Sequence, residues 1–85
     1  MRSEDLPSPN DKAAIWAFAM SFNSYDQYGS LESAAVAARE RRRSSVAELR
    51  NELFMAARAS RHGDSEVYVQ RYEELLPLFR RLLSV

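Results

Sequence analysis

Residues that favour β-strands are nearly missing from this chain. It contains no threonine, and its other β-branched residues are Ile15 and five valines. Alanine, leucine, arginine and glutamate, which all favour helices, dominate instead. Two glycines and three prolines in 85 residues are about half the usual share, so few positions interrupt a helix. The composition predicts an all-α fold, and the length predicts a single domain.

Capping residues divide the chain into four expected helices. These run from Pro9 to about Tyr25, from Leu31 to about Arg42, from Val46 to about His62, and from Asp64 or Ser65 to the C-terminus. The stretch SYDQYGS is expected to be a loop after the first helix, and Pro77 should bend the last helix without breaking it. We therefore expect a compact four-helix bundle over residues 9–85, preceded by a short flexible or disordered tail over residues 1–8.

The stretch ARERRRSSVAE, residues 38–48, carries four arginines in five positions. Ser45 and Glu48 form an S-x-x-E capping box, which predicts a break between the second and third helices. A fusion of these two helices into one long rod remains an alternative. Around the helix axis the arginines scatter: Arg42 should pair with an acid or extend along the bundle edge, whereas Arg39 and Arg43 should point to solvent.

The first expected helix is apolar on nearly all sides. One face carries Ile15, Phe18 and Ala19, while Trp16 and Met20 lie on the other. Such a helix is either the central helix of the bundle, which we favour, or a helix whose second face meets another subunit. Under the second interpretation Trp16 and Met20 form a dimer interface.

The third expected helix also has two faces. Leu49 and Leu53 point inward, and a mixed apolar and polar set lies opposite. That set, which we predict to bind a protein partner, is Asn51, Phe54, Met55, Arg58 and His62. The alternative is that this helix packs on both sides. The last helix has one apolar stripe, formed by Tyr68, Tyr72, Leu75, Leu76, Phe79, Leu82 and Leu83.

No pattern in the sequence indicates catalysis. His62 is the only histidine and there is no cysteine, so we expect no metal and no cofactor. Glu73 and Glu74 are adjacent on a helix and point about 100° apart, which prevents them from acting as a carboxylate pair. We therefore expect a protein that is not an enzyme and has no catalytic residues.

Residues Gly29 to Leu53 resemble the helix-turn-helix of bacterial one-domain transcription regulators. The similarity is in the start "GSLESAA" and in the helix, turn and helix that follow, and it covers less than a third of the chain. The turn carries RERRR where those regulators have Gly-hydrophobic-Ser, and the second helix begins with Glu48 and Glu52. The resemblance implies DNA binding through residues 29–62, which we retain as the alternative function.

The main functional expectation is a small, bacterial-type, non-enzymatic module that binds another protein and forms a homodimer. Nucleic-acid binding is disfavoured because the formal net charge is zero and the arginines share no face. The longest apolar run, Ala13 to Met20, is too short to cross a membrane, and residues 1–10 do not resemble a signal peptide. We accordingly expect a cytoplasmic protein.

Overall fold

The computed structural model describes residues 1–60 and 65–84, and every regular element in these residues is helical. The chain is therefore all-α, as predicted. The elements are η1 (Ser3–Asp5), α1 (Lys12–Met20), α2 (Ser24–Tyr28), α3 (Leu31–Arg39), α4 (Val46–Ala59) and α5 (Ser65–Leu83).

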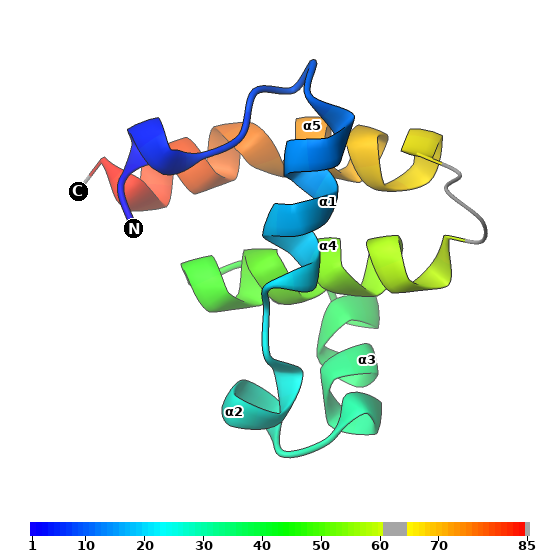
Figure 1. The fold of residues 1–85 in the computed structure, drawn as a ribbon. Helices are drawn as coiled ribbons and strands as arrows, with labels where there is room; N and C mark the ends of the chain where they lie inside the picture. Colours follow the sequence, from blue (N-terminus) through cyan, green and yellow to red (C-terminus); the bar gives the residue numbers. More distant parts are fainter. Residues whose placement is uncertain (61–64, 85) are drawn as a thin grey trace.

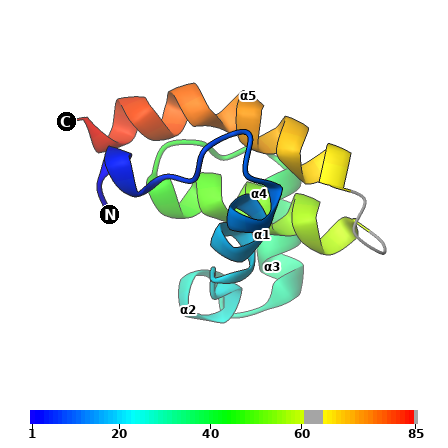
Figure 2. The same ribbon diagram turned by 45° about the horizontal axis from the view of Figure 1, so that its top comes forward.

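Helix α4 is the centre of the bundle. Helix α5 runs antiparallel along it, α1 crosses both helices, and α3 packs against α4 on the side away from α5 (Figures 1 and 2). The prediction that the first helix is central is therefore wrong. Helix α4 has buried side chains on several sides, whereas α1 buries only Ile15 and Ala19 completely.

The core lies where α1, α4 and α5 meet. Phe18 of α1 stands edge-on to Phe79 of α5, with ring centroids 5.6 Å apart. Each large apolar side chain that is fully buried stabilises a fold by roughly 1.5–3 kcal/mol. The most buried members of the cluster are Ile15, Ala19, Leu49, Leu53, Ala57, Tyr72, Leu75 and Phe79. The predicted stripe of the last helix is confirmed, since its first five members are buried and the last two are half-buried.

The first expected helix is in fact two helices. Asp11 caps α1, because its carboxylate accepts a hydrogen bond of 3.0 Å from the amide of Ala14, so the helix begins at Lys12 and not at the expected Pro9. The side chain of Asn23 then caps α2, whose last residue is followed by Gly29 in the left-handed conformation, φ 77°. The stretch SYDQYGS is thus mostly helical, and the prediction of a loop is wrong.

The N-terminal segment lies along the C-terminal half of α5 (Figure 2). Leu6 packs against the core, and the carbonyl of Pro7 accepts a hydrogen bond from the hydroxyl of Tyr72. These contacts describe where residues 1–8 lie, and the expected flexibility of this tail stays a prediction.

The break between α3 and α4 is confirmed, and the fused rod is excluded. Ser45 accepts a hydrogen bond of 3.2 Å from the amide of Glu48, as a capping box requires. In return, Glu48 accepts from the amide of Ser44 at 3.1 Å, one residue earlier than expected. Helix α5 continues through Pro77, as predicted.

Candidate functional site

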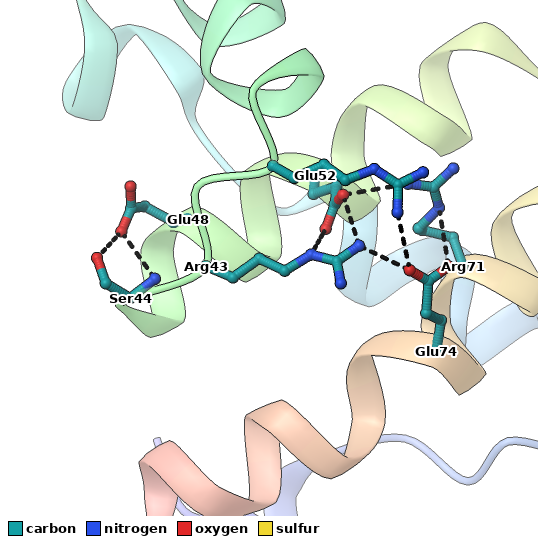
Figure 3. A network of polar contacts seen from close by, with 7 residues as sticks. Arg43, Ser44, Glu48, Glu52, Arg71 and Glu74 are labelled. Carbon is teal, nitrogen blue, oxygen red and sulfur yellow. Dashed lines mark hydrogen bonds and ion pairs between the residues drawn. The ribbon is translucent and has the colours of Figure 1, made fainter.

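A buried carboxylate organises the segment between α3 and α4. Glu52 of α4 is only 3% exposed. Its two oxygens accept hydrogen bonds from Nε and Nη2 of Arg43, at 2.9 and 3.0 Å (Figure 3). This parallel, two-bond geometry is the strongest form of the arginine–carboxylate pair. It raises the pKa of Arg43, chiefly through the hydrogen bonds with Glu52. The prediction that Arg43 points to solvent is therefore wrong.

Helix α5 completes the network. Arg71 donates to Glu52 at 3.1 Å, and Glu74 accepts from Arg43 at 2.7 Å and from Arg41 at 3.3 Å. The hydrogen bond from Arg43 is the main reason why the pKa of Glu74 is lowered. The network joins the α3–α4 link to both long helices, so part of the arginine run has a structural role.

A pocket of about 430 Å³ opens beside this network, between α3, α4 and α5. Its lining combines apolar side chains, three arginines and the buried Glu52. The lining residues are Ala35, Ala38, Arg39, Arg41, Glu52, Met55, Ala56 and Arg71. Its volume is in the range of small-ligand sites, which is about 300–1,000 Å³.

Arg41 has a strained backbone at the edge of this pocket. Its φ of 51° is the only positive value of a non-glycine residue in the described chain. The amide of Arg41 donates a hydrogen bond of 3.1 Å to the carbonyl of Ala38, and the amide of Arg42 donates one of 3.3 Å to the carbonyl of Ala37. These two bonds form a Schellman motif in which Arg41 takes the position that glycine usually fills. A side chain there costs about 1 kcal/mol or more.

A second candidate surface is the outer face of α1. Four apolar residues on it, at helical spacings of three and four, are exposed: Ala13, Trp16, Ala17 and Met20. Trp16 is 38% exposed although its ring contacts Tyr68, with centroids 5.4 Å apart, and Met20 is 39% exposed. The bundle covers the other face of α1 and leaves this stripe uncovered.

Comparison with known proteins identified no relative. No family model matches the chain, and no curated protein or solved structure matches it either. Within residues 1–60 and 65–84 there is no cluster of three or more potential metal ligands. In the same residues no helix combines the length and the apolar character that a membrane span requires.

The structure separates the five residues that were predicted to bind a partner. Phe54 is 7% exposed and packs on Phe22, with ring centroids 5.9 Å apart. Asn51 is buried and its amide donates to the carbonyl of Ala34 at 2.9 Å. The premise that these two side chains lie on a free surface is wrong, because the segment after α1 covers one and α3 covers the other.

The other three members of that set have different surroundings. Met55 is half-buried and lines the pocket, and Arg58 is exposed. His62 lies outside the described residues. The helix thus packs on two sides, which was the alternative interpretation of its sequence, and partner binding by Met55 or Arg58 stays a prediction.

Sequence reasoning missed Glu52 and Arg50. Glu52 falls three residues after Leu49 on an inward-facing position of α4, so it required a basic partner. Arg50 is half-buried, with its guanidinium 5.0 Å above the ring of Phe18, and it donates to the hydroxyl of Ser21 at 2.7 Å. Burial lowers the pKa of Arg50. The guanidinium group of Arg50 lies at the C-terminal end of α1, where the helix dipole favours a cation.

Proposed function

We propose that this protein is a non-enzymatic interaction module that forms a homodimer through the exposed apolar face of α1. The observation that supports this proposal is the stripe of Ala13, Trp16, Ala17 and Met20. Large apolar side chains that lie in a continuous line on a small protein mark an interaction surface. Tryptophan and methionine are enriched at such surfaces.

A second copy of the chain fits this face because the face carries almost no charge. Within α1, only Lys12 is charged, and it lies at the N-terminal end of the helix. Two antiparallel copies of α1 would place each Lys12 beside the C-terminal carbonyl groups of the other helix, where a cation is favoured. The two alanines allow the helices to approach closely. The contact would be isologous, as in most homodimers.

The size of the face predicts a weak dimer. Nine helical residues extend over about 14 Å. A stable interface buries about 800 Å² on each partner, and the whole chain exposes 5,325 Å². One short helix contributes only part of that area, so we expect a dissociation constant in the micromolar range, with association that depends on concentration.

The packing gives no support to the DNA-binding alternative. Helix α4 would have to enter the major groove, yet α1, α3 and α5 all pack against it. Its only exposed residues are Arg58 and Ala59, both in the last turn.

Sedimentation equilibrium or light scattering after gel filtration tests the proposal. The wild type should change from monomer to dimer as its concentration rises through the micromolar range. Met20→Lys should abolish the dimer, because it places a charge in the apolar stripe near the helix C-terminus, where a cation does not disturb the helix itself.

Val36→Lys is the matched control. Val36 lies near the C-terminal end of α3 and is 39% exposed, the same fraction as Met20. This variant should dimerise like the wild type. A wild type that stays monomeric at high micromolar concentration would show that the homodimer proposal is wrong, as would equal effects of the two substitutions.

A further inference from the structure

We propose that the pocket between α3, α4 and α5 binds the carboxylate of a ligand that carries a small apolar group next to it. The pocket is formed by a different part of the molecule from the α1 stripe, so this inference does not depend on the dimer. It rests on the charge around the pocket, its apolar wall, and the conformation of Arg41.

Positive charge exceeds negative charge around the pocket. The ion-pair network and the pocket lining together contain four guanidinium groups and two carboxylates, which leaves an excess of two positive charges. These residues are Arg39, Arg41, Arg43, Arg71, Glu52 and Glu74. Among the described residues, Arg39 forms no ion pair. Arg41 has only one, an exposed contact with Glu74. Exposed pairs contribute little, so both guanidinium groups can turn to an incoming anion.

The rest of the wall determines what kind of anion fits. The apolar part of the lining consists of Ala35 and Ala38 of α3 and Met55 and Ala56 of α4. The alanines leave room, and the thioether of Met55 can adapt to different apolar shapes. A ligand that fills this space therefore needs an apolar part beside its charged group.

The position of the pocket favours one negative charge over two. It lies at the C-terminal end of α3, which ends at Arg39. The carbonyl end of a helix carries partial negative charge and repels a dianion more than a monoanion. Phosphate sites are usually at the opposite end of a helix. A carboxylate, which a guanidinium group can hold with two parallel hydrogen bonds, matches the site better.

The third observation that supports the proposal is the backbone conformation of Arg41. A glycine at this position would form the same turn without strain, yet the chain has an arginine there with φ 51°. Strained residues of this kind concentrate at binding sites. The turn holds the arginine side chain at the edge of the pocket, where it can reach a bound anion.

NMR titration of the ¹⁵N-labelled protein with N-acetyl-L-leucine tests the proposal. This probe carries one carboxylate beside one branched apolar group. The signals of Arg39, Arg41, Met55 and Arg71 should shift together, with a dissociation constant near 1 mM, as is usual for a ligand of about a dozen non-hydrogen atoms. Two comparison probes, N-acetyl-L-leucinamide and inorganic phosphate, should bind at least about fivefold more weakly.

Neighbouring arginines provide a matched pair of variants. Arg41→Gln should weaken the binding of N-acetyl-L-leucine at least about fivefold, because it removes a charge-assisted hydrogen bond. Arg42→Gln removes the same charge one residue away, from a side chain that does not line the pocket and pairs with Glu40. It should change the affinity less than twofold. Met20→Lys, which targets the dimer, should leave this binding unchanged.

Several results would overturn the proposal. Shifts scattered over all arginines would indicate non-specific anion binding, and equal affinity for the leucinamide would show that the carboxylate is not recognised. Equal or tighter binding of phosphate would show that the apolar wall plays no part. An absence of shifts up to 20 mM probe, or equal losses in Arg41→Gln and Arg42→Gln, would also contradict it.

A last comparison distinguishes two sources of the same chemistry. A pentapeptide that ends in leucine with a free carboxylate is compared with its C-terminal amide. If the free-acid peptide binds at least about tenfold more tightly than N-acetyl-L-leucine, the natural ligand is a peptide C-terminus. Equal affinity of the two acids assigns the pocket to a small free acid. A peptide amide that binds as well as the free acid contradicts the proposal.

Discussion

Glu52 and Arg43 form a two-bond ion pair, with hydrogen bonds of 2.9 and 3.0 Å, between the middle of α4 and the segment that precedes it. Arg71 connects this pair to α5 (Figure 3). This relationship gives the arginine run a role that does not require nucleic acid. One of its arginines neutralises a carboxylate that is almost fully buried.

The first prediction concerns this pair. Glu52→Gln should lower the free energy of unfolding by about 2–4 kcal/mol, because it leaves Arg43 and Arg71 without their shared carboxylate. Glu74→Gln is the control: it removes the same charge from an exposed partner of the same network and should lose less than about 1 kcal/mol. Urea unfolding of both variants gives the comparison. Similar losses would mean that the burial of Glu52 does not matter.

The second prediction follows from the φ of 51° at Arg41. Arg41→Gly should keep the free energy of unfolding equal to that of the wild type or raise it by up to about 1 kcal/mol, since relief of strain exceeds the loss of one exposed ion pair. Arg42→Gly, at a residue without a positive φ, should lower it by about 0.5–1 kcal/mol. If both variants lose stability equally, the left-handed turn is not strained.

Periodicity and capping residues predicted the helical class, the α3–α4 break and the buried stripe of α5. Each of these depends on local sequence. The expected start of α1 at Pro9 was wrong because Ser8 and Asp11 are both residue types that cap helices, and the local sequence does not choose between them. The central position of α4 was missed because a helix face that carries Phe54 and Asn51 can lie either against solvent or against a neighbouring element.

The candidate site was less predictable than the fold. Arg43 and Glu52 are nine residues apart and belong to different segments, so their pairing depends on the turn between them. The strain at Arg41 cannot be inferred from an arginine in a polar stretch. Only the inward position of Glu52 on its helix was available as a signal, and it would have required a search for a buried basic partner.

The third prediction tests the burial of Phe54. Because its ring packs on Phe22, Phe54→Ala should create a cavity and lower the free energy of unfolding by about 3–5 kcal/mol. Arg58→Ala, one turn later at an exposed position, should stay within about 0.5 kcal/mol of the wild type. Thermal and urea melts measure both. A loss below about 1 kcal/mol for Phe54→Ala would restore the prediction that this ring is a free contact residue.

The fourth prediction concerns acid. The hydroxyl of Ser44 lowers the pKa of Glu48, and the hydrogen bond from Arg43 lowers that of Glu74. Groups with lowered pKa values stabilise the folded state above their unfolded pKa, near 4.5, and this contribution is lost as the pH falls further. Stability should therefore be level from pH 7 to about 5 and fall below about 4.5. Glu48→Gln and Glu74→Gln should each make the fall less steep in thermal melts, by under about 1 kcal/mol, because both groups contact solvent.

The last prediction concerns Tyr72 at high pH. Burial raises the pKa of its hydroxyl from 10.0 to about 12, and the hydroxyl donates to the carbonyl of Pro7. The folded state thus favours the neutral form. Its contribution is complete well below pH 10, where unfolded tyrosine is half ionised, and is lost as the pH rises through about 12.

Tyr72→Phe should lower the free energy of unfolding by about 1 kcal/mol at pH 8, because the hydrogen bond to Pro7 is lost. Between pH 10 and 12 the wild type should lose up to about 2 kcal/mol more than this variant, since phenylalanine cannot ionise. Tyr25→Phe is the control, because Tyr25 is exposed and should behave like the wild type throughout. Urea unfolding at pH 8, 10, 11 and 12 measures all three proteins. If the difference between wild type and Tyr72→Phe stays constant over this range, the hydroxyl of Tyr72 is not protected from ionisation and the N-terminal segment does not cover it in solution.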